Sequence, residues 1–271
     1  MAVVQARRNL LAITAEGFKP PLFKQDNSIR SRLENRLRRF LDVQAGSLWR
    51  DLALELGQVR GNLLDVGCGA QVYRALLPSE VVYRGIDTAD AKAHFGYSMP
   101  DTHYFNNDDW GLPDSAFDTV LCTEVLEHIT DPSAFLASVF RCLRPGGRLV
   151  LTVPFAARWH FIPYDYWRFT PSGLFRLLCA AGLDEVRVQA RGNPLTVACY
   201  KIMTLQLTLL FGSRRSFTGI AKCAFGTILL PILALLACVA NISLHSDWGD
   251  DCLGYTVTAR RPVPPTEANL E

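Results

Sequence analysis

The sequence lacks several features that would assign a function directly. Its eight cysteines form no CxxC pair and no cluster at zinc-ligand spacing, which predicts reduced, mostly buried thiols and no metal centre. Basic residues outnumber acidic ones only narrowly, 28 against 26, so the composition gives no strongly basic face for nucleic acid. We therefore expect neither a metal ion nor a nucleic-acid partner.

A secretory leader is not expected either. Arg7 and Arg8 precede an apolar run at 10–15 that is too short for the hydrophobic region of a leader with a cleavage site. The protein body is therefore expected in the cytoplasm. The chain has 271 residues, 49% of them hydrophobic, which is enough to bury a sizeable core, and one domain with extensions is expected.

Short apolar runs alternate with helical patterns through the middle of the chain. Strands are predicted at 62–66, 81–86, 117–122, 148–153, 185–189 and 254–260, and helices at 131–143 and 171–181. The first of these helices ends in Arg-Pro-Gly-Gly at 144–147, which predicts a helix stop followed by a turn. This alternation predicts an α/β fold with a mostly parallel sheet and helices on both faces.

Residues 28–43 predict a basic amphipathic helix, because apolar side chains recur at helical spacing while arginines occupy most other positions. The apolar set is Ile29, Leu33, Leu37, Phe40 and Leu41, and the charged set is Arg30, Arg32, Glu34, Arg36, Arg38 and Arg39. Two interpretations stay open. The helix packs over a sheet edge with a solvated arginine face, or it binds a membrane surface or phosphate.

A buried strand runs into a glycine turn at 67–69, and a helix is predicted after it. At such a turn a ligand can approach backbone N–H groups closely. A GxG turn alone is weak evidence for a ligand site. Asp87 strengthens it, because it ends the next strand 22 residues beyond Asp65, where a carboxylate can accept both ribose hydroxyls of an adenosine. A turn-forming role for Asp87 is the alternative. A dinucleotide motif would need a third glycine where this chain has Val72, which argues against pyrophosphate binding.

Six motifs in the right order resemble the class I S-adenosylmethionine-dependent methyltransferases, specifically the type 11 group, over about residues 62–189. They are Leu-Asp-Val-Gly-Cys-Gly at 64–69, Gly-Ile-Asp at 85–87, Asp-Asp-Trp-Gly-Leu-Pro at 108–113, Ser-Ala-Phe-Asp at 115–118, Glu-Val-Leu-Glu-His at 124–128 and Leu-Arg-Pro-Gly-Gly at 143–147. The resemblance implies a Rossmann-like, seven-stranded sheet and S-adenosylmethionine as cofactor. The family usually has a third glycine where this chain has Gln71, so a tighter loop is expected.

The resemblance also implies which residues hold the cofactor. The loop at 65–69 would bind the methionine part, Asp87 the ribose and Asp108 the adenine amino group, with Asp109 or Trp110 beside the ring. The full set implied for cofactor binding is Asp65, Gly67, Cys68, Gly69, Asp87, Asp108, Asp109, Trp110 and Glu124.

The segment at 154–170 is the candidate acceptor wall, because it follows a strand at the carboxyl end of the sheet, where ligands of open α/β sheets bind. Its predicted acceptor-binding residues are Trp159, Tyr164, Asp165, Tyr166 and Arg168. His128 and His160 are the candidate catalytic bases. Two alternatives stay open. Asp165 and Arg168 pair only to shape the loop, and His128 only forms hydrogen bonds at the start of a helix.

The stretch at 191–253 is the least family-like part of the chain. Residues 223–244 are 22 residues without formal charge, long enough to span a bilayer, and Pro231 divides them. A span would put the strand at 254–260 across the membrane from its sheet. We therefore favour an apolar helical hairpin that dips into one leaflet or clamps a lipid-like substrate. A true span, and a buried helical subdomain or dimer interface, stay open.

These patterns divide the chain into an N-terminal arm with a basic helix at 1–60, a cofactor-binding core at 61–190, a hydrophobic helical insertion at 191–253, and a final strand with a Pro-rich tail at 254–271. They predict a methyltransferase that acts on a small acceptor of lipid-linked or glycan type. Peripheral membrane contact is predicted through 217–244 and 28–43. The alternative function is a non-catalytic, S-adenosylmethionine-binding scaffold or regulator at a membrane.

Overall fold

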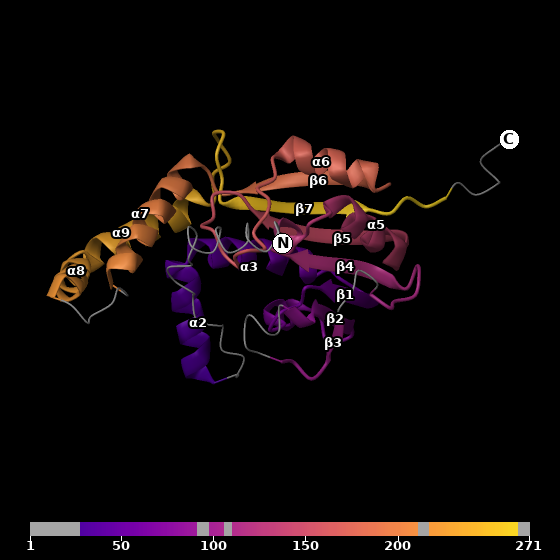
Figure 1. Cartoon of the computed structure of the whole chain (residues 1–271), viewed down its shortest axis with the longest axis horizontal. Coiled ribbons are helices and arrows are strands. Elements are labelled where there is room, and N and C mark those ends of the chain that lie inside the picture. Colours follow the sequence, from indigo (N-terminus) through magenta and orange to yellow (C-terminus); the bar gives the residue numbers. More distant parts are fainter. Residues whose placement is uncertain (1–27, 91–97, 106–109, 211–216, 265–271) are drawn as a thin grey trace, which may run out of the picture. The chain divides into compact units, whose positions relative to one another are not determined.

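The computed structural model describes residues 28–90, 98–105, 110–210 and 217–264 (Figure 1). These residues form two compact units. The sheet unit consists of Asp51–Phe155, Pro163–Gln189 and the chain from Tyr255 onwards. The helical unit consists of the described chain up to Arg50 together with Ala156–Ile162 and Ala190–Gly254.

A seven-stranded sheet in the order β3-β2-β1-β4-β5-β7-β6 forms the centre of the fold. The strands are β1 (Asn62–Val66), β2 (Val82–Thr88), β3 (Thr102–Phe105), β4 (Phe117–Thr123), β5 (Leu143–Pro154), β6 (Asp184–Arg191) and β7 (Gly254–Arg260). The pairs from β3 to β5 in this order are all parallel. Strand β1 is buried along almost its whole length, as expected for a parallel sheet covered on both faces. The predicted Rossmann-like, mostly parallel fold is confirmed.

Among the described residues, α5 (Pro132–Cys142), α6 (Pro171–Ala180) and the second half of α3 (Val43–Leu56) belong to the sheet unit, and α5 and α6 begin at side chains that accept backbone N–H groups. Asp131 caps α5, and Thr170 caps α6. Helix α5 contacts α6 and strands β4 and β5, where it buries its apolar face. The third helix, α3, buries Leu52 and Leu56 in a core cluster with residues of β1, β4 and β5.

Four local features differ from the sequence-based expectations. Strand β3 and helix α3 were not predicted. The helix expected after the glycine loop is a short 3-10 helix, η1 (Val72–Leu76). The turn expected at 144–147 lies inside β5, whose pairing with β4 shifts register there. Gly146 has a φ of +77°, which lets the extra residues bulge without ending the strand.

The helical unit contains α2 (Ile29–Leu41), α7 (Pro194–Leu210), α8 (Phe217–Ile228) and α9 (Leu230–Ser243). The break between α8 and α9 falls where Pro231 occupies the first turn of α9, because proline lacks the N–H that would continue a helix. Within the described residues, no single helix is both long and apolar enough to cross a membrane. Residues 218–228 and 230–243 meet that criterion only as a pair, and the pair is bent by 53°.

Helix α2 forms as predicted, with Ser28 accepting the N–H of Ser31 at its start. The first part of its apolar stripe is exposed. Ile29, Leu33 and Leu37 are 72%, 61% and 59% exposed, and the helix contacts α9. Phe40 and Leu41, at the other end of the stripe, pack against the core of the helical unit.

Candidate active site

The glycine turn connects the carboxyl end of β1 to η1. Gly67 and Gly69 have φ values of +69° and +54°, which side-chain-bearing residues rarely adopt. The N–H of Gly67 donates to the carbonyl oxygen of Ile86 at 2.9 Å, so the turn is held against β2. A Cβ atom at Gly67 would lie 2.4 Å from Cγ2 of Val125. Glycine is therefore required at this position for both conformation and space.

Asp87 lies at the carboxyl end of β2, where its carboxylate meets this turn. Oδ2 accepts the N–H of Gly69 at 2.9 Å, and Oδ1 accepts the N–H of Thr88 at 2.7 Å. Burial raises the pKa of the Asp87 carboxyl, while these two N–H donors act in the opposite direction. Asp87 thus shapes the turn, and a carboxylate oxygen keeps further acceptor capacity for hydroxyl groups.

Asp65 and Cys68 lie beside it in a poorly hydrated environment. Asp65 is 3% exposed, and the hydroxyl of Tyr83 donates to its Oδ2 at 2.8 Å. Burial raises the pKa of Asp65 to about 7, and the neighbouring Asp87 adds to this shift. Burial also raises the pKa of the Cys68 thiol to about 12. Cys68 is therefore a neutral thiol at physiological pH and no nucleophile.

Gln71 occupies the position at which the resembling family has its third glycine. Its backbone is left-handed, with φ 53° and ψ 36°, as a glycine there could adopt without strain. Two hydrogen bonds fix its buried side chain: Nε2 donates to Thr102 Oγ1 at 3.0 Å, and Oε1 accepts from Arg74 at 2.9 Å. The departure from the family pattern therefore keeps the turn conformation and ties it to β3.

Trp110 and Glu124 are the remaining predicted cofactor residues that the structure describes, since Asp108 and Asp109 lie outside the described residues. Trp110 is 3% exposed, and its ring meets that of Phe135 edge-on with 5.4 Å between centroids. Glu124 follows β4 with a φ of +53°. A left-handed glutamate is strained, and such residues gather at functional sites.

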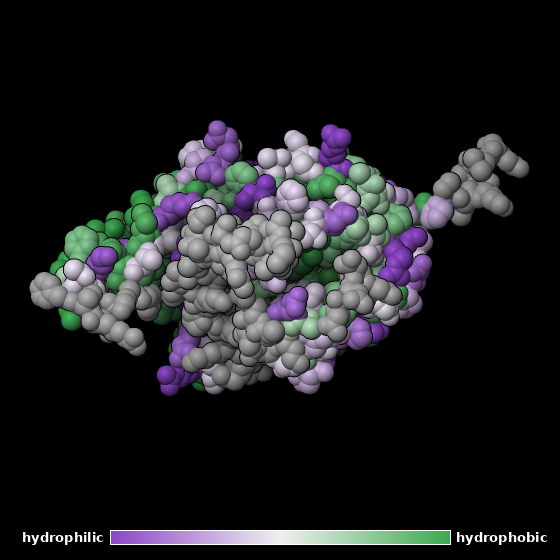
Figure 2. Space-filling view, viewed as in Figure 1, coloured by the Kyte–Doolittle hydropathy of each residue, from purple (hydrophilic) through white to green (hydrophobic). Residues whose placement is uncertain are grey.

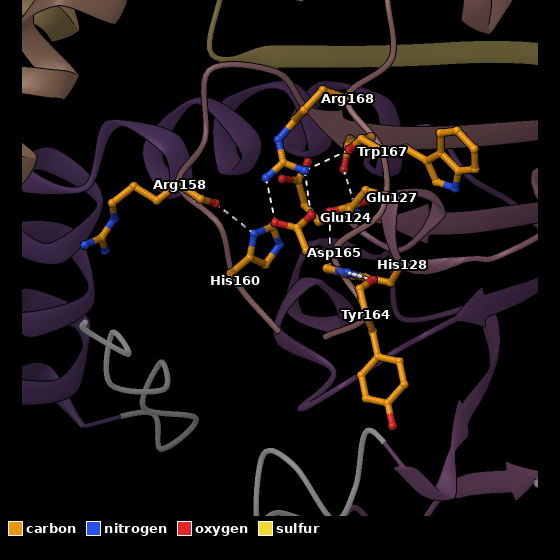
Figure 3. Close-up of polar contacts among 10 residues, drawn as sticks. Glu124, Glu127, His128, Arg158, His160, Tyr164, Asp165, Trp167 and Arg168 are labelled. Carbon is orange, nitrogen blue, oxygen red and sulfur yellow. Dashed lines mark hydrogen bonds and ion pairs between the residues drawn. The ribbon is translucent and has the colours of Figure 1, made fainter. Parts of the chain in front are cut away.

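The loop after β5 contains an ion pair between Asp165 and Arg168, which was one of the two interpretations left open by the sequence. The guanidinium of Arg168 donates to both carboxylate oxygens of Asp165, at 2.6 and 2.8 Å, and the Asp165 side chain is only 1% exposed (Figure 3). The Arg168 side chain keeps 24% exposure. Because a buried carboxylate needs such a partner, this pair shapes the loop whether or not it also binds an acceptor.

Backbone hydrogen bonds fix the same loop against the 3-10 helix η2 (Leu126–His128). The N–H groups of Tyr166 and Trp167 donate to the carbonyl oxygen of Glu127 at 2.9 and 3.2 Å. Both aromatic side chains stay exposed, at 39% and 43%. Aromatic rings on a fixed backbone can therefore meet a ligand without ordering a mobile segment.

His128 has oxygen neighbours at both ring nitrogens. Nδ1 lies 3.0 Å from the carbonyl oxygen of Tyr164, and Nε2 lies 3.6 Å from Oε1 of the fully buried Glu127 (Figure 3). The contact with a carbonyl requires a proton on Nδ1. This geometry matches the alternative in which His128 orients a local structure.

Trp159 and His160 belong to the helical unit, whereas Tyr164, Asp165, Tyr166 and Arg168 belong to the sheet unit. Trp159 is 69% exposed. Nδ1 of His160 lies 3.1 Å from the carbonyl oxygen of Arg158, which fixes the proton on Nδ1 and makes Nε2 the basic nitrogen of the neutral ring.

Several residues of this region were missed by sequence reasoning. Tyr83, Thr102 and Glu127 contact the predicted site residues Asp65, Cys68 and His128, yet none was assigned a role. Glu127 was quoted within a motif, and a glutamate in an apolar run is itself a sign of a buried functional or structural acid. Nothing in the sequence marked Tyr83 or Thr102, because their role depends on the pairing of β1, β2 and β3.

The α/β fold, the positive-φ glycine turn and the Asp87 carboxylate at the end of β2 are the features expected of an S-adenosylmethionine-dependent methyltransferase. The chain belongs to the methyltransferase domain family, whose model matches residues 34–187. The glycine turn and Asp87 fit S-adenosylmethionine, which is the cofactor of this class. The predicted class, enzyme type and cofactor are confirmed.

Two curated relatives are O-methyltransferases. A ubiquinone biosynthesis O-methyltransferase of Ruegeria pomeroyi is 33% identical over 171 residues, which cover 52% of this chain and 67% of that protein. The O-methyltransferase cnsE of Penicillium expansum is 32% identical over 122 residues, covering 41% and 44%. A crystal structure of a SAM-dependent methyltransferase from Archaeoglobus fulgidus matches with a TM-score of 0.50 at 18% identity, covering 86% of this chain and all of that one.

We expect Asp87→Ala to weaken S-adenosylmethionine binding by about 1.5–3 kcal/mol, roughly tenfold to a hundredfold in Kd, because hydrogen bonds to a charged group are lost. Isothermal titration calorimetry measures this loss directly. Asp101→Ala is the matched control, since Asp101 is an exposed carboxylate paired with Arg74 at 2.6 Å. Equal affinity in the Asp87 variant and the control would remove Asp87 from the cofactor site.

Proposed function

We propose that the enzyme transfers the methyl group of S-adenosylmethionine to a hydroxyl oxygen of a small, lipid-linked acceptor. The observation that carries this proposal is the exposed apolar surface of the helical unit, which joins the methyltransferase sheet between β6 and β7. The names of the two O-methyltransferase relatives support oxygen as the acceptor atom. A glycan-type acceptor is the competing substrate class.

Methyl transfer is an in-line displacement, and S-adenosylmethionine supplies both the methyl group and its leaving group. The protein's main task is therefore to align the acceptor atom with the methyl group. We assign cofactor binding to Asp65, Gly67, Cys68, Gly69, Asp87, Asp108, Asp109, Trp110 and Glu124. We assign acceptor binding to Trp159, Tyr164, Asp165, Tyr166 and Arg168. In this assignment Asp165 holds Arg168, whose exposed part contacts the acceptor.

A hydroxyl group is a weak nucleophile until it loses its proton, so oxygen methylation benefits from a general base. We assign this role to His160, because its Nδ1 contact with the carbonyl of Arg158 leaves Nε2 as the proton-accepting atom. His128 is instead assigned as a positioning residue. Its two nitrogens lie beside oxygens of Tyr164 and Glu127, and it thereby supports the acceptor loop.

A lipid-linked acceptor is reached most directly by an enzyme at a membrane surface. We therefore propose that the protein works at the cytoplasmic face of a membrane, with contact through 217–244 and 28–43. The exposed apolar stripe of α2 and its arginines support this location.

The test is turnover of S-adenosylmethionine carrying a labelled methyl group. We expect the protein to methylate a phenol that carries a long alkyl tail, presented in detergent micelles, with a higher kcat/KM than the same phenol without the tail, because the tail adds binding surface. A glycolipid serves as the third substrate. Methylation of the glycan alone, or of neither phenol, would contradict the proposed acceptor.

A further inference from the structure

The outward side of α9 is entirely apolar. Its exposed residues are Leu230, Pro231, Ile232, Ala234, Leu235, Cys238 and Ile242. Leu235 and Ile242 are 63% and 72% exposed. A helix at a water-facing surface normally carries its polar residues on that side. The exposed side of α9 has the composition expected of a buried face.

The same property extends to the two neighbouring helices. Figure 2 shows hydrophobic residues gathered over α7, α8 and α9. The large hydrophobic side chains that are exposed on α7 and α8 are Leu195, Ile202, Leu205, Ile220, Phe225 and Ile228. Among the described residues of the three helices, Lys201 and Lys222 are the only charged ones. The apolar surface therefore extends over all three helices of the insertion. It is larger than the isolated exposed hydrophobic residues that ordinary protein surfaces carry.

Polar and small side chains face the interior of this helical unit. Thr196, Gln206 and Ser243 are at most 6% exposed, and the hydroxyls of Thr196 and Ser243 lie 2.6 Å apart. Ala237 and Ala240 are fully buried in the same core. The core also holds large apolar side chains, but polar groups inside and large apolar residues outside depart from a water-exposed helical bundle. This arrangement is typical of helices surrounded by lipid.

The dimensions favour an orientation along the membrane surface. Helix α9 has 14 residues and is therefore about 21 Å long, shorter than a hydrocarbon core of roughly 30 Å. The bend of 53° before it prevents α8 and α9 from forming one straight span. A bent, short, apolar pair fits the boundary between headgroups and acyl chains.

The charged residues of the same unit favour a lipid with an anionic headgroup. Helix α2 is attached to α9 through the side chain of Asn241, whose Nδ2 donates to the carbonyl oxygen of Phe40 at 2.9 Å. Arg32 and Arg36 are exposed beside the apolar stripe of α2, and within the described part of the chain neither has an acidic partner. Residues 194–243 contain no aspartate or glutamate at all. Helices α7 to α9 therefore present apolar surface without acidic groups, and α2 adds exposed arginines, a combination that complements anionic headgroups.

We infer that α2, α7, α8 and α9 form a docking surface for an anionic lipid leaflet. The outward residues of α7 to α9 lie among acyl chains, and the arginines of α2 lie at the headgroups. This inference deepens the proposed function. It rests on that function only in assuming that the enzyme meets its acceptor in the membrane. The polarity of the helical unit carries the lipid contact itself.

The experiment is co-sedimentation of the full chain with vesicles, either of phosphatidylcholine alone or of phosphatidylcholine mixed with phosphatidylglycerol. We expect binding to the mixed vesicles. The triple variant Ile228→Ser, Leu235→Ser, Ile242→Ser should bind about tenfold more weakly or worse, because it removes inserted side chains. All three are exposed, so little change in folding stability is expected. The control is Leu54→Ser, Val82→Ser, Phe175→Ser, which changes equally exposed apolar residues of the sheet unit.

A second variant tests the charge. Arg32→Gln with Arg36→Gln should remove most of the preference for phosphatidylglycerol and most of the weakening by salt, since screening acts on exposed charges. Equal vesicle binding by the parent and the triple serine variant would overturn the inference. So would a parent protein that ignores both vesicles and forms a lipid-free dimer that the serine variant dissociates, because a second copy would then cover the surface.

The outcome is separable from that of the proposed function. Methylation of the tail-less phenol in solution should be equal in the parent and the serine variant, because none of the three residues belongs to the proposed site. If no acceptor is methylated while the parent still binds mixed vesicles and the variant does not, the acceptor proposal fails and the lipid surface stands.

Discussion

His160→Gln is expected to lower kcat by about 10²–10⁴-fold, the usual contribution of a general base. Glutamine keeps the size and one hydrogen-bonding end of the side chain but cannot accept a proton near neutral pH. The affinity for S-adenosylmethionine should not change, since His160 is assigned to the acceptor. Single-turnover kinetics with labelled cofactor measure the chemical step, and calorimetry measures the cofactor affinity.

Two controls decide between catalysis and structure. His245→Gln makes the same change at an exposed histidine of the same unit and should leave kcat unaltered. In the parent enzyme, kcat should fall on the acidic side as the base becomes protonated, and the variant should lose that limb. Retention of the parent's rate and pH profile by His160→Gln would exclude it as the base.

His128→Gln separates the two histidines. A positioning role predicts a rise in KM and a lower unfolding temperature, because the contacts with Tyr164 and Glu127 are disturbed. The acidic limb of the pH profile should persist. A loss of that limb would reassign the base to His128.

Gly67→Ala should abolish measurable cofactor binding and destabilise the fold by about 2–5 kcal/mol. About 1–2 kcal/mol comes from forcing alanine into a left-handed conformation at φ +69°. The rest, about 1–3 kcal/mol, comes from overpacking, because the new Cβ would lie 2.4 Å from Val125. Denaturant unfolding and calorimetry measure the two effects.

Two further variants separate the conformational cost of Gly67→Ala from the cost of crowding against Val125. Gly111 has a similar φ of +60°, and a Cβ there would meet nothing within 4 Å, so Gly111→Ala should incur only the conformational cost. Val125→Ala combined with Gly67→Ala should recover part of the stability, since only the Cβ of residue 125 would remain, at 3.4 Å. A Gly67 variant no less stable than the Gly111 variant would refute the crowding argument.

The sequence predicted the sheet unit well because its signals are local. Apolar runs at 62–66 and 254–260 became β1 and β7 with those same bounds, and the helix at 171–181 became α6. Side-chain pattern and capping residues act over a few positions and do not depend on the rest of the fold. The edge strand β3 was not predicted from the sequence, because Thr102–Phe105 is short and only partly buried and therefore has a weak apolar pattern.

The site was predictable where one residue type is required and not where partners are shared. A glycine at 67 permits the positive φ that the turn adopts. The place of Asp87 at the end of a strand puts its carboxylate beside that turn. Whether Arg168 faces an acceptor or Asp165 was open in the sequence, because both uses need the same residues. The bidentate contact became visible only in the folded loop.

By itself the sequence determined the α/β class, the glycine turn, the break at Pro231 and the charge-free segment at 223–244, because each follows from backbone restrictions or composition within a short segment. Only the tertiary structure decided that Gln71 adopts a glycine conformation through Thr102 and Arg74. It also decided that α7 to α9 expose a large share of their apolar side chains while Thr196, Gln206 and Ser243 are buried. The physical reason is that burial and hydrogen-bond partners depend on residues far apart in the chain, which no local pattern encodes.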